Sequence, residues 1–115
     1  MMRSLSRIAV GVGVLAFALL LAAARQPVPQ APAASVTVTI DNFSFTPKEI
    51  TIAKGTTVTW VNHDDVPHTV VDADKVFRSK ALDTDDRFSF TFNDAGTFGY
   101  FCSVHPMMTG KVVVK

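Results

Sequence analysis

Apolar residues occupy every second position in several short stretches of the sequence, and this alternation constrains the fold more than any other feature. In residues 36–41 (VTVTID) valine and isoleucine alternate with polar residues, and in residues 88–93 (FSFTFN) phenylalanine does the same. A period of two places the apolar side chains on one face of a β-strand and the polar ones on the other. The alternation predicts half-buried strands, and residues 35–115 contain no pattern of a long amphipathic helix.

Other short strands are predicted between segments that favour turns. They cover residues 49–52, 57–61, 69–71, 97–102 and 110–114. Lys54-Gly55 separates the first two of these strands, which predicts either a hairpin or a crossing between sheets, and residues 93–96 form a second turn signal. Seven or eight short strands in one small domain predict an all-β fold, a β-sandwich.

Residues 73–86 have no clear period. Asp83, Asp85 and Asp86 lie close together in this segment. A run of carboxylates without apolar periodicity is typical of a solvated loop, and we predict a loop here.

The N-terminal segment predicts export of the protein. Arg3 and Arg7 precede residues 8–24, which are 17 consecutive apolar or glycine residues. Small-residue cleavage sites are offered by residues 22–24 (AAA) and 31–33 (APA). This order is typical of a secretory signal peptide, so we predict a signal peptide over residues 1–24. Seventeen residues is also the lower limit for a membrane-spanning helix, and an uncleaved N-terminal anchor is the alternative. The protein is therefore expected to be periplasmic or otherwise exported, and attached to a membrane only if the segment is retained.

Residues 25–34 are rich in proline and alanine and lack aromatic residues, which predicts a linker. The folded domain is expected to cover residues 35–115, enough for one small core. Within residues 35–115, eight Lys and Arg residues face ten Asp and Glu residues, so the formal charge is −2 for the domain and +1 for the whole chain. The domain has no basic run, which argues against a nucleic-acid partner.

Cys102 is the only cysteine of the chain. It cannot form a disulfide within one molecule, so it is an intermolecular bridge, a free thiol or a metal ligand. An exposed free thiol is readily oxidised outside the cytoplasm, which favours burial or metal ligation. Its neighbours favour ligation, because Cys102, His105 and Met108 follow the spacing C-x2-H-x2-M at the end of a predicted strand.

A thiolate, an imidazole and a thioether at this spacing can converge on one metal ion if the loop folds back. Two histidines, one cysteine and a weak methionine ligand are typical of an electron-transfer copper site. The second histidine must be His63 or His68. We favour His68, because it stands where a predicted loop becomes a strand, whereas His63 lies beside two aspartates and is expected to be exposed.

Two longer stretches carry a resemblance to a known family. Residues 94–114 resemble the C-terminal copper-binding segment of cupredoxins, the type 1 blue copper proteins, and the short C-x2-H-x2-M loop is similar to that of the amicyanins. Residues 55–62, followed by Val66-Pro67-His68, resemble the family segment that bears the first histidine ligand. The plastocyanins and pseudoazurins are more distant relatives with longer ligand loops. The resemblance covers about residues 35–115.

The resemblance implies a cupredoxin-like Greek-key β-sandwich that binds one type 1 copper ion. It implies that His68, Cys102 and His105 are the equatorial ligands and that Met108 is the axial ligand. Many relatives have asparagine after the first histidine, where it helps to fasten the cysteine loop, and this chain has Thr69. A threonine hydroxyl can also form that hydrogen bond, so we expect the loop to hold.

Several alternatives remain open at the level of the sequence. Zinc also accepts cysteine and histidine ligands, although a methionine as the fourth ligand fits copper better. Met107 and Met108 could be core residues, and Cys102 a buried apolar residue. An apolar shell is expected around the site, made of Phe98, Tyr100, Phe101 and Val112.

The favoured function is a monomeric carrier that moves single electrons between redox partners such as a dehydrogenase, a cytochrome or an oxidase. Copper handling or storage is the alternative. An oxidase or nitrite reductase would need further histidines, and only His63 is left over. We therefore expect that the protein is not an enzyme.

Overall fold

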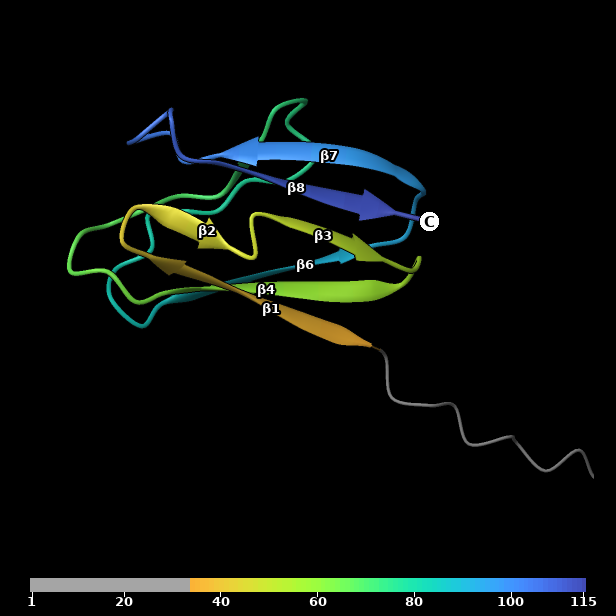
Figure 1. The fold of residues 1–115 in the computed structure, drawn as a ribbon, viewed down its shortest axis with the longest axis horizontal. Coiled ribbons are helices and arrows are strands. Elements are labelled where there is room, and N and C mark those ends of the chain that lie inside the picture. The colour runs from red at the N-terminus through yellow and green to blue at the C-terminus, as the bar shows by residue number, and fades with distance from the viewer. Residues whose placement is uncertain (1–33) are drawn as a thin grey trace, which may run out of the picture. The chain divides into compact units, whose positions relative to one another are not determined.

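The computed structural model describes residues 34–115, and the predicted signal peptide and residues 25–33 of the predicted linker lie outside the described residues. No helix within residues 34–115 is long and apolar enough to cross a membrane. The described part contains eight strands (Figure 1). These are β1 (Ser35–Asp41), β2 (Ser44–Thr46), β3 (Glu49–Ile52), β4 (Thr56–Asn62), β5 (Val71–Asp72), β6 (Arg87–Phe92), β7 (Gly96–Phe101) and β8 (Thr109–Val114).

The strands form two four-stranded sheets that pack face to face. The first sheet has the order β2-β1-β4-β6 and the second has the order β3-β8-β7-β5. Both sheets are mixed, because β1 pairs with β4 and β3 with β8 in parallel, while the other pairs are antiparallel. This arrangement confirms the predicted all-β, cupredoxin-like Greek-key β-sandwich.

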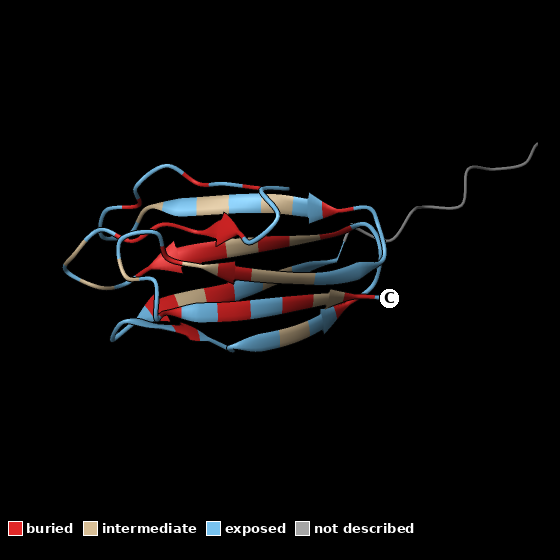
Figure 2. Cartoon of the chain, turned by 90° about the horizontal axis from the view of Figure 1, so that it is seen from above, coloured by how far each residue is buried: buried red, intermediate tan, exposed pale blue. Residues whose placement is uncertain are grey.

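The core lies between the sheets, and buried and exposed residues alternate along most strands (Figure 2). Trp60 on β4 is at the centre, fully buried, with its indole ring next to four other aromatic rings. These are Phe77, Phe88, Phe92 and Tyr100. Replacing a buried tryptophan by alanine typically costs about 3–5 kcal/mol, so this cluster is a main source of stability.

Some predicted strands differ from the observed ones. Strand β2 was not predicted, because three residues are too few to show a period. The strand predicted over residues 69–71 begins only at Val71. Of the two predictions for Lys54-Gly55, the crossing is correct, since β3 and β4 belong to different sheets. Gly55 has a φ of 86°, a left-handed conformation that glycine adopts without strain.

The segment over residues 73–86 is more than a solvated loop. Phe77, Ser79 and Leu82 are buried in it, whereas Asp83 and Asp85 are exposed as predicted. Two isolated bridges, Val71 to Arg78 and His68 to Leu82, hold the segment against the sandwich. The prediction of a loop is correct, since no named strand lies between β5 and β6, but the buried residues were missed because scattered single apolar residues show no period.

Candidate metal centre

Three segments that are far apart in the sequence meet at one end of the sandwich. They are the β1–β2 turn at residues 42–43, the connection between β4 and β5 at residues 63–70, and the β7–β8 loop at residues 102–108 (Figure 1). β1 and β4 both end on this side because they are parallel, and β7 of the second sheet ends there too. This end of the domain contains all four predicted ligand residues.

The structure brings three of the predicted ligands into direct contact. The Sγ atom of Cys102 lies 3.7 Å from Nδ1 of His68 and 3.8 Å from Nδ1 of His105. The two Nδ1 atoms are 3.2 Å apart. Among the described residues, these three form a group that could hold a metal ion.

The spacing of the three donor atoms matches what one metal ion requires. With bonds of about 2.0–2.1 Å to nitrogen and about 2.3 Å to sulfur, a trigonal arrangement needs N–S separations of about 3.8 Å and an N–N separation of about 3.5 Å. The observed values of 3.7, 3.8 and 3.2 Å deviate from these by a few tenths of an ångström at most. The donor set therefore fits a single ion with little rearrangement.

Local backbone hydrogen bonds fold the β7–β8 loop back on itself. The N–H of His105 donates to the carbonyl of Cys102, the N–H of Met108 donates to the carbonyl of His105, and the N–H of Cys102 donates to the carbonyl of Met108, at 3.2, 2.9 and 3.0 Å. The fold of the loop gives the two adjacent methionines different environments. Met108 is 6% exposed and belongs to the core, whereas Met107 is 95% exposed.

His68 is held from both its backbone and its ring. It is fully buried and exchanges two backbone hydrogen bonds with Leu82. Its Nε2 atom lies 2.8 Å from Oδ2 of Asp64. A carboxylate can only accept, so Nε2 carries the proton and Nδ1 keeps its lone pair for a metal. A carboxylate on the outer nitrogen is a common way to orient a ligating histidine.

The loop that precedes His68 is braced by Asn62, the last residue of β4. Its buried side-chain amide donates to the carbonyls of Val66 and Leu82, at 2.9 and 2.8 Å, and its Oδ1 accepts the N–H of Asp64. The Asp64 carboxylate in turn accepts three hydrogen bonds. Burial raises the pKa of Asp64, but the N–H groups of Phe43 and Asn42 and the ring of His68 outweigh this and lower the pKa below its usual value.

Cys102 has an environment that favours its thiolate. Burial raises the pKa of the thiol, but the Thr69 N–H and the rings of His68 and His105 lower it, to about 6 in total. The Thr69 N–H lies 3.4 Å from Sγ. A thiolate is the form of cysteine that binds metals, so this residue is prepared for ligation.

Thr69 also fastens the cysteine loop. Its hydroxyl oxygen accepts the backbone N–H of Ser103 and lies 2.7 Å from the Ser103 hydroxyl. These contacts connect the residue after His68 with the residue after Cys102. They confirm the expectation that threonine can hold the loop at a position where many relatives have asparagine.

The comparisons with known proteins agree with this geometry. The sequence profile of the family described as a cupredoxin-like domain matches residues 11–114. The chain belongs to the cupredoxin-like family. The amicyanin of Paracoccus versutus is 39% identical over 83 residues, which are 68% of this chain and 63% of that protein. The plastocyanin of Scenedesmus fuscus is 42% identical over 84 residues, which are 62% of this chain and 86% of that protein.

Solved structures give the same result for the fold of this cupredoxin. The crystal structure of the P. versutus amicyanin matches with a TM-score of 0.66 and 39% identity, covering 75% of this chain and 86% of that chain. Other amicyanin structures include a reduced state, an oxidised state and a Cu(I) form. A Cu-containing nitrite reductase of Thermus scotoductus matches with a TM-score of 0.67 and 34% identity, over 70% of this chain but 22% of that chain.

Two residues beside the candidate metal centre of this cupredoxin were not predicted to contribute to it. Asp64 stands four residues before His68, a separation that has no fixed meaning in an irregular loop. Phe43, in the β1–β2 turn, places its ring edge-on to the rings of His68 and His105, with centroid distances of 5.4 and 5.0 Å. Nothing in the sequence marks this phenylalanine, since the β1–β2 hairpin itself was not predicted.

His63 lies outside the donor group. It is exposed, and its Nδ1 is 3.8 Å from a carboxylate oxygen of Asp85. Of the residues predicted to form an apolar shell, Tyr100 and Val112 are buried in the core and Phe98 is partly buried, whereas Phe101 lines a groove on the outside of the second sheet.

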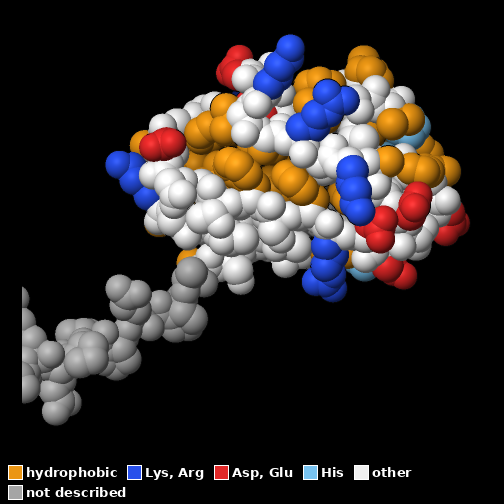
Figure 3. Space-filling view, turned by 180° about the vertical axis from the view of Figure 1, so that it is seen from behind, with side chains coloured by type: hydrophobic (Ala, Val, Ile, Leu, Met, Phe, Trp, Pro, Cys, Tyr) orange, Lys and Arg blue, Asp and Glu red, His pale blue; other side chains and the backbone are white. Residues whose placement is uncertain are grey.

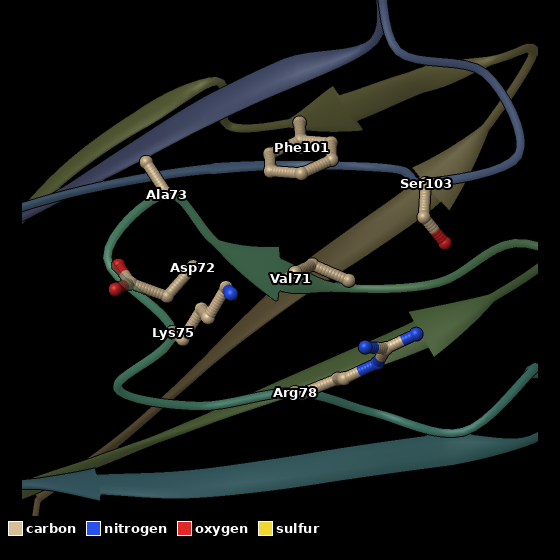
Figure 4. Close-up of a pocket in the computed structure, with 7 residues that line it drawn as sticks. All are labelled: Val71, Asp72, Ala73, Lys75, Arg78, Phe101 and Ser103. Carbon is tan, nitrogen blue, oxygen red and sulfur yellow. The ribbon is translucent and has the colours of Figure 1, made fainter.

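That groove has a volume of about 290 Å³ and lies beside the short edge strand β5 (Figure 4). Phe101 and Ser103, the neighbours of Cys102, line one side of it, and Lys75 and Arg78 line the other. Among the described residues neither cation forms a salt bridge. The groove shares no residue with the donor group of His68, Cys102 and His105.

Proposed function

We propose that this cupredoxin carries single electrons by cycling one type 1 copper ion between Cu(II) and Cu(I). His68, Cys102 and His105 are the equatorial ligands, and Met108 is the weak axial ligand. The observation that carries this proposal is the convergence of three donor atoms within bonding range of one point. Two imidazoles, one thiolate and a weak thioether form the ligand set of blue-copper electron-transfer sites. The reduced, oxidised and Cu(I) forms of amicyanin support the same chemistry.

The bound copper would supply the change of one electron, and the protein residues hold the site still while this happens. Asp64 and the Leu82 backbone prevent rotation of His68. The hydrogen bond from the Thr69 N–H stabilises negative charge on the Cys102 sulfur. Burial of Met108 and Cys102 excludes water from the ligand set. Ligands that keep their places in both oxidation states reduce the rearrangement that each electron transfer requires.

We propose further that the protein is not an enzyme. The likeness to a nitrite reductase covers 22% of that chain, so most of that enzyme has no counterpart in the match. An enzyme of that kind needs a second metal or substrate site, and His63 is the one histidine of residues 34–115 outside the donor group. Its exposed position beside Asp85 offers no enclosed site for a substrate.

The predicted organisation of the chain completes the proposal. Residues 1–24 direct export as a signal peptide, or remain as a membrane anchor, residues 25–34 are a linker, and residues 35–115 carry the copper. The protein acts in the periplasm or another exported compartment as a monomer. Its partners are a redox protein that donates the electron and one that accepts it, and not nucleic acid.

The end of the domain at the copper site is the proposed docking surface. Apolar side chains reach the surface there next to acidic ones (Figure 3). Met107, Val104 and Phe43 are 95%, 56% and 51% exposed, and Pro67 and Pro106 are exposed beside them. Exposed apolar patches with polar rims commonly mark interaction sites, and weak redox encounters use small interfaces.

Repeated redox cycling of the copper-loaded full chain distinguishes a carrier from a copper-handling protein. We expect one copper per chain, an intense visible absorption when oxidised, and retention of the metal through many cycles of reductant and oxidant. A His63→Ala variant is the matched control and should behave in the same way. Transfer of copper to a mild chelator in each cycle would support handling or storage and contradict the carrier function.

A further inference from the structure

The hairpin turn between β1 and β2 has an unusual backbone. Asp41 pairs with Ser44, which leaves a turn of two residues, Asn42 and Phe43. Their φ angles are 50° and 55°, the two positive values that a type I′ hairpin turn requires. Asparagine tolerates this conformation and glycine prefers it, but a bulky aromatic residue does not. Phe43 is therefore held in a strained conformation.

The strain places the aromatic ring against the metal centre. The ring stands nearly perpendicular to both imidazoles, at interplanar angles of 89° to His68 and 90° to His105. It also borders a shallow pocket of about 110 Å³ together with Met107 and Met108. Phe43 is 51% exposed, so one part of the ring covers the histidines while the other faces solvent.

One carboxylate holds the strained turn and the ligand together. Asp64 accepts the N–H of Asn42 at 2.6 Å, the N–H of Phe43 at 2.9 Å and the Nε2–H of His68 at 2.8 Å. Both backbone donors of the turn thus point to the carboxylate that also holds the ligand histidine. The conformation of the turn and the orientation of His68 are therefore coupled through Asp64.

We propose that Phe43 is a positioning residue of the copper site, a cap that limits rotation of both imidazoles and keeps water from the ligand set. This inference rests on the proposed function, because it concerns the same donor group. Strained backbone is retained at functional sites where the strain places a side chain that the site needs. A glycine at this position would give a relaxed turn without the cap.

Replacing Phe43 by glycine separates the effect of the backbone strain from the effect of the aromatic cap. In the metal-free full chain, Phe43→Gly should keep or raise the melting temperature, because glycine adopts positive φ without strain. The same variant should increase the rate at which diethyl pyrocarbonate modifies His105 severalfold, measured by mass spectrometry against exposed His63. With copper bound, the reduction potential and the visible spectrum should shift.

Two further variants provide controls. Asn42→Gly relaxes the neighbouring turn position and keeps both the backbone donor and the Phe43 ring, so His105 reactivity and the spectrum should stay as in the wild type. Phe43→Tyr restores an aromatic ring and should restore the wild-type reactivity of His105. Unchanged His105 reactivity in Phe43→Gly would overturn the cap. If Phe43→Gly lowers the melting temperature as much as Phe43→Leu does, the inference that the backbone of Phe43 is strained is wrong.

The outcomes also distinguish this inference from the proposed function. If the wild type takes up copper and turns blue but Phe43→Gly does not differ from it in reactivity or spectrum, the function stands and the cap is wrong. If His105 becomes reactive in metal-free Phe43→Gly but the wild type does not form a blue copper site, the cap stands and the copper function is wrong.

Discussion

The two histidines of the centre differ in how the protein holds them. His68 is fully buried, exchanges backbone hydrogen bonds with Leu82 and donates its outer nitrogen to Asp64. His105 is only partly buried, and within residues 34–115 no protein group forms a hydrogen bond with its outer nitrogen. One imidazole is thus part of the scaffold, and the other reaches toward solvent from a loop. We infer that His68 fixes the geometry of the site and that His105 connects it with a partner.

The largest effect tests the sulfur that both histidines approach. Cys102→Ser removes this proposed thiolate ligand, so the copper-loaded variant should lose its intense visible absorption completely. The charge transfer behind that colour requires a sulfur ligand, and a serine hydroxyl cannot replace it. Absorption and copper content are measured on the same sample. Retention of the blue colour in Cys102→Ser would rule out the proposed ligand set.

Alanine variants of the two histidines test the comparison directly in the metal-free protein. His68→Ala leaves a cavity and removes a buried hydrogen bond to Asp64, so the free energy of unfolding should fall by about 2–4 kcal/mol. His105→Ala removes a half-buried loop side chain and should change that free energy by less than about 1 kcal/mol. Urea denaturation measures both. Equal losses would mean that the two histidines are held alike.

The features that could be predicted from the sequence depend on local patterns. Alternation over residues 36–41 and 88–93 predicted β1 and β6, because side-chain direction in a strand follows from position alone. The spacing of Cys102 and His105 predicted that their donor atoms lie close together, because the backbone hydrogen bonds of that loop are local.

The features that escaped prediction depend on contacts between distant segments. Asp64 is defined by hydrogen bonds to the β1–β2 turn, more than twenty residues away in the sequence. Phe43 has a positive φ, which is unfavourable for a bulky residue, so a rule based on the local sequence predicts a negative φ at this position. Both residues act on His68, the histidine that belongs to the scaffold. The unpredicted residues are thus those that contact His68 and not the proposed metal ligands themselves.

A smaller effect separates the two methionines on the loop that carries His105. Met108→Gln should lower the reduction potential, because a harder oxygen ligand stabilises Cu(II) relative to Cu(I). Met107→Gln should shift the potential several times less, since this side chain is 95% exposed and outside the core. Cyclic voltammetry of the two variants under one set of conditions gives the comparison. Equal shifts of the potential, or a larger shift for Met107→Gln, would show that the assignment of Met108 as the axial ligand is wrong.

The smallest structural change tests whether electrons leave on the His105 side. Met107→Glu adds a charge at the exposed apolar surface next to His105 and should slow electron exchange with the redox partner about tenfold, equivalent to about 1.4 kcal/mol. The visible spectrum should not change, because the four proposed ligands remain. Val76→Glu is the matched control, since Val76 is 51% exposed, apolar and located beside Asn93 and Asp94 near the β6–β7 turn. It adds the same net charge away from His105, so it should leave the rate near the wild-type value. If both variants slow the exchange equally, net charge alone controls the encounter, and His105 loses its proposed role as the contact between the copper and the partner.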